Sequence, residues 1–262
     1  MNLELNEKHV LIAGGTRGIG LACAKAFLAE GSVVTVVGRQ PENLDAALKE
    51  LQEAGGRVQG RCADLTDAAS AAKMVDAVWS EVGAIDVLVN AAGAAKRTPF
   101  PELTPETWAA AMNSKFFSYV NVFDPTVKKM ATRGSGSIVN IVGMGGKVAT
   151  TTHLGGGSAN AALMLASAGL AAAYAAQGVR VNVINPALTM TERLREGLVA
   201  EARMKGISTE EAFTQAKARF PMGRLASPED VADAVLFLSS SRAAYISGVS
   251  LSLDGAATPL AV

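Results

Sequence analysis

A glycine-rich turn near the start of the chain constrains the fold more than any other feature. The turn Gly14–Gly20, with the sequence GGTRGIG, follows the apolar run Val10–Ala13 and opens a helical pattern. In such a strand–turn–helix unit, Gly14 permits a tight turn, Gly18 lets the backbone approach a pyrophosphate, and Gly20 lets the helix pack closely on the sheet. The turn therefore predicts a dinucleotide site, with the phosphates held by the N–H groups and dipole at a helix N-terminus.

Short apolar runs alternate with helical patterns along the whole chain. The runs are mostly continuous and rich in β-branched residues, as expected for strands buried on both faces of a parallel sheet. We predict an α/β fold: a single doubly wound parallel-sheet Rossmann domain over residues 1–262 with about seven strands. The predicted strands are Val10–Ala13, Val33–Val37, Val58–Cys62, Ile85–Val89, Ser137–Val142, Val179–Ile184 and Val249–Leu253, and the predicted helices are Gly20–Glu30, Asn43–Ala54, Ala68–Val82, Pro105–Thr132, Ser158–Gln177 and Pro228–Leu238.

One stretch, Thr189–Arg219, interrupts this alternation. It contains two charged, amphipathic helical pieces, which indicate a small helical lid or an insertion over the substrate side. The lid mixes apolar side chains with charges, so a partly apolar ligand is expected beneath it.

Composition excludes several classes of function. The 24 basic and 24 acidic residues cancel and form no basic cluster, which argues against a nucleic-acid partner. Two cysteines make neither a disulfide framework nor a metal site, and Cys23 is expected to be a buried core thiol. The N-terminus lacks a signal-peptide core, and no uninterrupted run of about 18 apolar residues is present. We therefore expect a cytoplasmic protein with no membrane partner, no metal and a small-molecule substrate.

The end of the second predicted strand bears on the choice of dinucleotide. A site selective for NAD places a carboxylate there for the ribose 2′-hydroxyl, and Gly38 supplies none. Arg39 and Arg17 can instead bind the 2′-phosphate of NADP(H) through charge-assisted hydrogen bonds. The alternative is that both arginines are solvated surface charges. The sequence favours NADP(H) over NAD(H).

With these motifs, nearly the whole chain resembles the classical short-chain dehydrogenase/reductase (SDR) family. Asn90–Gly93 is similar to the family's NNAG with one asparagine replaced, Asp64-Leu65 matches the acid that contacts adenine, and Pro186 with Thr191 resembles PGxxxT. The resemblance also implies a homodimer or homotetramer through the long central helices. Together with the glycine turn, it implies cofactor contacts from Gly14, Thr16, Arg17, Gly18, Ile19, Gly20, Arg39, Asp64, Leu65, Asn90, Ala91, Gly93, Pro186 and Thr191.

The catalytic tetrad of the family is the exception. Asn113 matches the helix asparagine, but the family's spacing assigns its serine to Gly143, its tyrosine to Gly156 and its lysine to Asn160. No Tyr-x-x-x-Lys occurs anywhere in the chain. A positioned general acid/base is worth about a hundred- to ten-thousandfold in rate, so ordinary carbonyl reduction is expected to be slow unless another group acts.

A second glycine-rich segment, Gly143–Gly157, surrounds the positions of the missing residues. Within it His153 lies three residues before the tyrosine position, and an unperturbed histidine titrates near neutrality. We therefore expect His153 to be a substitute acid/base or a substrate anchor; the alternative is a solvated or packed loop histidine. Two functions stay open: an NADP-dependent oxidoreductase with a rebuilt site for a small carbonyl, alcohol or enone, and a catalytically impaired NADP(H)-binding sensor subunit.

Overall fold

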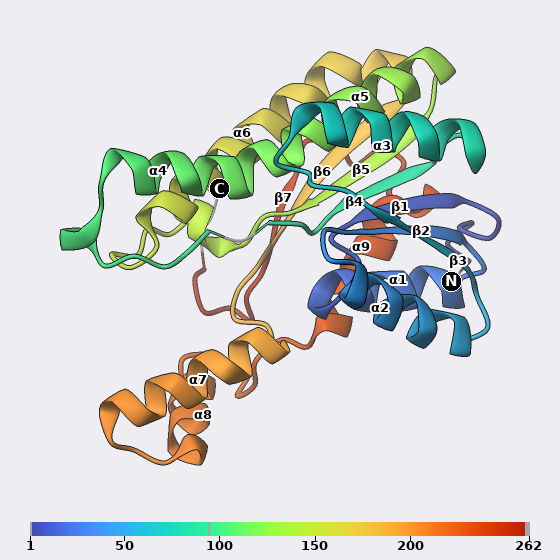
Figure 1. Ribbon diagram of the computed structural model, residues 1–262. Coiled ribbons are helices and arrows are strands. Elements are labelled where there is room, and N and C mark those ends of the chain that lie inside the picture. The colour runs from blue at the N-terminus through green and yellow to red at the C-terminus, as the bar shows by residue number, and fades with distance from the viewer. Residues whose placement is uncertain (1, 94, 260–262) are drawn as a thin grey trace.

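The computed structural model describes residues 2–93 and 95–259, except for the side chains of residues 193, 200, 201 and 204. Its centre is one parallel sheet in the order β3-β2-β1-β4-β5-β6-β7 (Figure 1). The strand order reverses between β1 and β4, which makes the carboxyl ends of these two strands the natural place for a ligand. The strands are β1 His9–Ala13, β2 Val33–Gly38, β3 Arg57–Cys62, β4 Val87–Asn90, β5 Gly136–Ile141, β6 Val179–Pro186 and β7 Ser250–Leu253.

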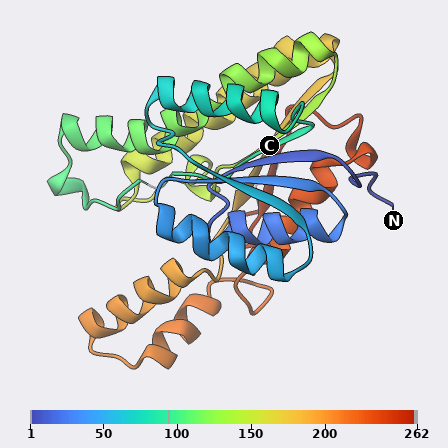
Figure 2. The ribbon, with the colours of Figure 1, turned by 45° about the vertical axis from the view of Figure 1, so that its right-hand side comes forward.

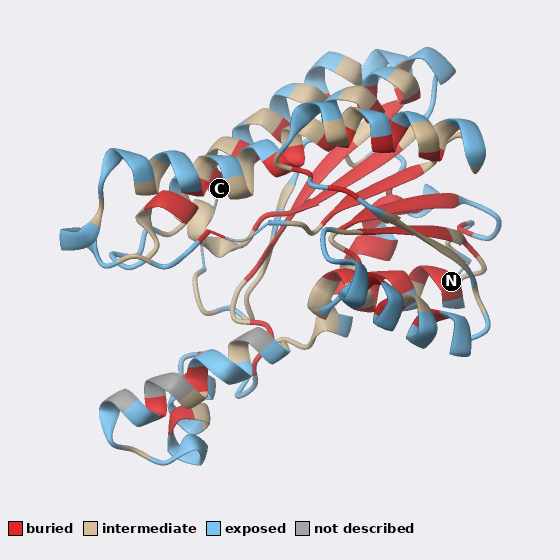
Figure 3. Cartoon of the chain, in the orientation of Figure 1, coloured by how far each residue is buried: buried red, intermediate tan, exposed pale blue. Residues whose placement is uncertain are grey.

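Helices cover both faces of the sheet, and the predicted doubly wound fold is confirmed. Helices α1, α2 and α9 lie on one face and α3, α5 and α6 on the other, as two views show (Figures 1 and 2). The central strands between the layers are buried (Figure 3), which explains their continuous apolar sequence. The six helices are α1 Gly18–Ala29, α2 Pro41–Glu53, α3 Ala68–Glu81, α5 Ser118–Arg133, α6 Leu154–Tyr174 and α9 Pro228–Ser239.

The predicted continuous helix Pro105–Thr132 is wrong in one respect. The structure divides this stretch into α4 Pro105–Ala111, a π-helical segment η2 Met112–Phe117, and α5. A π turn carries an additional residue, so it changes which side chains face the sheet. Apolar periodicity does not reveal such a turn because the pattern resumes on its far side.

Helix α6 begins at Leu154, four residues earlier than predicted, so three consecutive glycines lie in its first turn. Together with its 3₁₀ extension to Gln177, it is long and apolar enough by composition to cross a membrane. In this fold, however, it packs along the sheet beside β6 and against η2. Its outer face stays exposed, with Leu165 77% accessible.

The predicted lid consists of two helices, α7 Glu192–Lys205 and α8 Thr209–Lys217, which project from the rest of the molecule (Figures 1 and 2). A small apolar cluster joins Leu198 and Ala216 of these helices to Phe220 and Leu225, which follow them in the chain. The two helices are therefore packed against the chain segments beside them as well as against each other.

Candidate functional site

The glycine turn after β1 has no room for side chains. A Cβ atom on Gly14, whose φ is +83°, would lie 2.7 Å from Ala92 Cα, and one on Gly20 would lie 2.0 Å from the Gly14 carbonyl oxygen. A Cβ on Gly18 would lie 3.2 Å from Cγ2 of Thr191, which caps α7. The turn therefore brings together the end of β1, the loop after β4 and the base of the lid. This close-packed glycine cradle before a helix N-terminus fits dinucleotide phosphates.

The end of β2 places the expected adenosine contacts around Gly38. A Cβ there would lie 2.5 Å from Thr16 Cγ2, so this glycine also permits a close approach. Arg39 is exposed beside it. The hydroxyl and N–H of Thr66 both donate to Asp64 and hold the pKa of that carboxyl below its usual value, and the charge of Arg39 acts in the same direction. Asp64 is thus an ionised acceptor near the positive charge of Arg39. Arg17, on the glycine turn, is also exposed.

Polar side chains are buried at the carboxyl end of β4. Asn90 Nδ2 donates to Asn140 Oδ1 on β5 at 2.8 Å, and Asn140 Nδ2 donates to Ser167 Oγ on α6 at 2.9 Å. The Asn90 Oδ1 atom has no hydrogen-bond partner among the described residues. The next loop packs directly against η2, because a Cβ on Gly93 would lie 2.2 Å from the Ser114 carbonyl oxygen. Ala91 is partly buried, and Leu65 and Pro186 are buried.

The second glycine-rich segment has an unusual backbone at its start. Gly143 has φ +96° and ψ 152°, a conformation essentially restricted to glycine. Its carbonyl accepts a hydrogen bond of 3.1 Å from Asn185 Nδ2. Farther along, Lys147 Nζ donates to the Ser250 carbonyl and to Ser252 Oγ at 2.7 and 2.9 Å. The segment is therefore anchored to both β6 and β7.

His153 occupies the space in which a side chain at position 156 would begin. A Cβ on Gly156 would lie 2.2 Å from His153 Cε1 and 2.5 Å from its Nε2. The same Cβ would lie 2.9 Å from Ala95 Cβ. Because His153 is the N-cap residue of α6, its imidazole lies over the first turn of that helix. The place that the resemblance assigns to a tyrosine holds a histidine ring instead.

Asn160 lies one turn farther along α6 and is 96% buried, since its exposed fraction is 4%. Its Nδ2 would be 3.6 Å from a Cβ on Gly143 and 3.4 Å from one on Gly145. Its Oδ1 has no hydrogen-bond partner within the described part of the chain. The structure thus brings Gly143, Gly156, Asn160 and His153 together.

Asn113 lies on η2, and its side chain is exposed. Its catalytic role stays a prediction. On the same segment, Lys115 is partly buried and donates to the Ile141 carbonyl at the end of β5. Sequence reasoning missed Lys115 because its orientation depends on the π-helical turn.

A cavity of about 290 Å³ adjoins the first turn of α6. Ala111, in its wall, would lie 3.0 Å from a Cβ on Gly155, and the loop on its other side is joined to the His153 segment by a hydrogen bond from Thr98 N to the Thr152 carbonyl. The cavity therefore offers space for a small molecule near His153. Its lining residues are Lys96, Thr98, Thr107, Ala110, Ala111 and Ser114.

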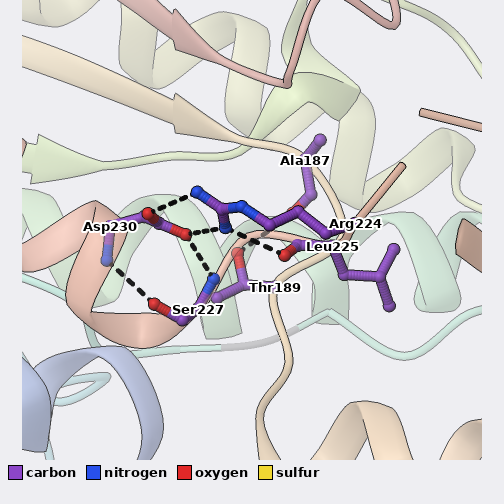
Figure 4. A network of polar contacts seen from close by, with 6 residues as sticks. All are labelled: Ala187, Thr189, Arg224, Leu225, Ser227 and Asp230. Carbon is purple, nitrogen blue, oxygen red and sulfur yellow. Dashed lines mark hydrogen bonds and ion pairs between the residues drawn. The ribbon is translucent and has the colours of Figure 1, made fainter. Parts of the chain in front are cut away.

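The lid is fastened beside α9 by a polar network (Figure 4). Arg224 binds the Asp230 carboxylate with two guanidinium nitrogens and also donates to the Leu225 carbonyl. Asp230 and Ser227 cap α9 reciprocally, so the fastening also fixes the start of this helix. Thr189 forms a parallel bridge with Ala226, so both ends of the lid meet here.

Residues 13–258 match the family model described as enoyl-(acyl carrier protein) reductase. The chain is also 32% identical over 259 residues to a 3α-hydroxysteroid dehydrogenase from Mediterraneibacter gnavus, covering 98% of this chain and 99% of that protein. The chain belongs to the short-chain dehydrogenase/reductase family. The family of oxidoreductases expected from the sequence is thereby confirmed.

Solved structures of the family have the same fold. A variant of actinorhodin polyketide ketoreductase crystallised with NADPH is similar at a TM-score of 0.91 and 32% identity, with 96% of this chain and 97% of that chain covered. The L-sorbose reductase from Gluconobacter frateurii, complexed with NADPH and L-sorbose, gives a TM-score of 0.92 at 29% identity, with coverage of 97% and 98%. This SDR chain therefore shares its architecture with reductases that act on small molecules.

Proposed function

We propose that this SDR protein is an NADP(H)-dependent oxidoreductase for a small organic carbonyl, alcohol or enone, with a non-standard active site. The observation that carries the proposal is the imidazole of His153 in the space where a side chain at Gly156 would begin. A histidine there is suited to hold or release a proton near neutral pH. Bound NADPH would supply the hydride, since that chemistry belongs to the cofactor.

In this proposal, His153 transfers the proton and Asn160 binds the cofactor or the substrate. The Nε2 atom of His153 exchanges a proton with the substrate oxygen or carbon. The buried amide of Asn160, with an Oδ1 that lacks a partner among the described residues, accepts a hydrogen bond from a ribose hydroxyl or the substrate. The adjoining 290 Å³ cavity has room for a small molecule.

The preference for NADP(H) is supported by the two exposed arginines at the adenosine end. Arg39 follows Gly38, which offers no carboxylate to a ribose 2′-hydroxyl, and Arg17 lies on the glycine turn. Exchanging both arginines for alanine should weaken NADPH binding at least tenfold, because each charge-assisted bond contributes about 1.5–3 kcal/mol. NADH binding should change little. Tighter binding of NADH than NADPH by the unaltered protein would refute the preference.

The central experiment measures NADPH oxidation with a panel of carbonyl and enone compounds. His153→Ala should lower turnover about a hundredfold or more while NADPH affinity is retained, because only the proton transfer is lost. His153→Gln keeps polarity but cannot titrate near neutrality, so it should fail equally and flatten the pH profile. Thr151→Ala, an exposed position in the same segment, is the matched control. Unchanged turnover and ligand affinity in His153→Ala would remove the proposal.

A second candidate is a catalytically impaired NADP(H)-binding sensor subunit. The backbone at Gly143 favours this candidate. Its φ is +96° and its carbonyl accepts a hydrogen bond from Asn185, so the backbone at this position is unusual and the change is more than the loss of a serine hydroxyl. Binding of NADPH without turnover across the whole panel would support this candidate over the enzyme.

We also propose that the protein is a homodimer or homotetramer. The outer faces of the central helices expose large apolar side chains, among them Leu165 on α6 and, at 46%, Phe117 on η2. A second copy would remove this apolar surface from water. Light scattering after size-exclusion chromatography would test the assembly, and Leu165→Glu should shift it toward the monomer.

A further inference from the structure

A lysine ammonium is held at the carboxyl end of β5. Lys115 Nζ donates to Tyr119 OH at 2.9 Å and to the Ile141 carbonyl at 3.3 Å. The same nitrogen lies 4.4 Å from the centre of the Tyr119 ring. Tyr119 is fully buried, and its own hydroxyl donates to the Ile141 carbonyl at 2.6 Å. The position of the ammonium is therefore set by a rigid aromatic residue and a strand end.

This place adjoins the loops expected to bind the dinucleotide. Gly14 packs on Ala92 and Gly93 packs on Ser114, the residue before Lys115. Along the sheet, the adenosine contacts follow β2 and β3, the glycine turn follows β1, and the loop 90–93 follows β4. An extended dinucleotide that starts at β2 and crosses the turn after β1 ends beside β4 and β5. Lys115 therefore lies on the nicotinamide side of the turn.

The π-helical segment explains why this lysine faces inward. It spans residues 112–117, and single π turns occur frequently at functional sites because they redirect side chains. Lys115 is partly buried there, while Asn113 and Phe117 are exposed. An inward lysine at this point adds a positive charge to a region in which Asn160 contributes a neutral amide.

We propose that Lys115 supplies the positive charge of the nicotinamide end of this site, with Tyr119 as its positioning residue. The inference rests on the proposed binding of NADP(H). In this inference, the positive charge comes from Lys115 on the π-helical segment, because position 160 is an asparagine and provides none. The charge acts through space on the bound cofactor and on negative charge that develops on the substrate.

The two redox states of the cofactor make this charge measurable. The nicotinamide ring of NADP⁺ is cationic and that of NADPH is neutral, while their other charges are the same. A nearby ammonium therefore disfavours NADP⁺ relative to NADPH. Removing the ammonium should lower the ratio of the dissociation constant of NADP⁺ to that of NADPH, and a general loss of packing would not change this ratio.

The experiment is a calorimetric titration of the full chain with NADP⁺ and with NADPH at low ionic strength, where screening is weak. Lys115→Gln should lower the ratio about tenfold, in keeping with unit charges several ångströms apart near a protein surface. Lys115→Arg keeps the charge, so its ratio should stay close to that of the unaltered protein. Lys128→Gln, an exposed lysine on α5 paired with Asp124, is the control and should leave the ratio unchanged.

The outcomes separate this inference from the proposed function. A lowered ratio in Lys115→Gln, with the ratio kept in Lys115→Arg and Lys128→Gln, supports the charge. Unchanged ratios in all three variants overturn it and leave NADP(H) binding intact. If Lys115→Gln does not fold, Tyr119→Phe takes its place. Loss of the Tyr119 hydroxyl loosens the ammonium, so the ratio of the two dissociation constants should fall, by less than in Lys115→Gln. A ratio equal to that of the unaltered protein would overturn the inference. Failure of the unaltered protein to bind either nucleotide overturns both proposals.

Discussion

The two glycine-rich segments of this protein, Gly14–Gly20 and Gly143–Gly157, use the same residue for different purposes. In the first, glycines let three pieces of backbone approach one another, as between Gly20 and the Gly14 carbonyl. In the second, one glycine adopts a backbone conformation closed to other residues, and another leaves room for the ring of His153. The first segment has the spacing that we expect for a phosphate-binding turn, whereas in our proposal the second replaces the family's catalytic residues.

In our proposal, the second segment is a site rebuilt around His153. Were Gly156 a simple deletion of a side chain, a Cβ there would meet open space. It would instead meet His153 and Ala95. Substitutions in the two segments should therefore differ in their effects on stability and turnover.

Gly20→Ala should be the most damaging change in the first segment. Its Cβ would lie 2.0 Å from a backbone oxygen that cannot move cheaply, so we expect a loss of about 3 kcal/mol in the free energy of unfolding. NADPH binding should be lost with it. The control is Gly169→Ala on α6, where nothing lies within 4 Å and a gain of about 0.5–1 kcal/mol is expected. Equal stability of the two variants in denaturant titrations would contradict the close packing of the turn.

Gly156→Tyr should destabilise the protein by about 2–3 kcal/mol and should not raise turnover, because His153 already occupies the space. The double variant with His153→Ala should recover at least about 1 kcal/mol of that loss, since residues in contact do not act additively. A double-mutant cycle in denaturant measures the coupling. Additive effects would mean that His153 does not fill the position.

Gly143→Ser should cost about 1–2 kcal/mol through backbone strain at φ +96° and should not restore carbonyl reduction. Gly223→Ser is a matched control, because Gly223 also has a positive φ, +68°, and has open space around it. Both variants should lose stability, but only Gly143→Ser should lower the rate of NADPH oxidation or weaken ligand binding. A rise in turnover in Gly143→Ser would show that the second segment is a conventional loop that lacks a hydroxyl.

The smallest expected effect is on the ion pair between Arg224 and Asp230 beside α9. Arg224 lowers the pKa of Asp230 to about 2 from 3.8, mainly through its hydrogen bonds to the carboxylate. The stabilisation by this ion pair is therefore complete above pH 4 and is lost as the pH falls toward 2. Asp230→Asn should lower the unfolding free energy by about 1 kcal/mol at pH 7, and the difference should shrink below pH 4. Asp233→Asn, an exposed position on the same helix, is the control; a difference that does not depend on pH would contradict the ion pair.

The sequence by itself determined the parallel α/β sheet, the glycine turn and the two helices α7 and α8, because apolar runs, helical periods and glycine spacing are local patterns. It also identified Cys23 as a core thiol, and burial raises the pKa of that thiol to about 12. The helical pattern of residues 105–132 does not reveal the break at η2, because the apolar pattern resumes beyond the π turn.

Tertiary structure alone decided what fills the second glycine-rich segment. The early start of α6 at Leu154 turns His153 over Gly156, and the π turn directs Lys115 toward the end of β5. The contact between Lys115 and Ile141 joins residues far apart in the chain, and the place of the His153 ring depends on where α6 begins. The sequence shows which residues are present and how far apart they lie in the chain. Which side chain fills a given space depends on how the backbone packs.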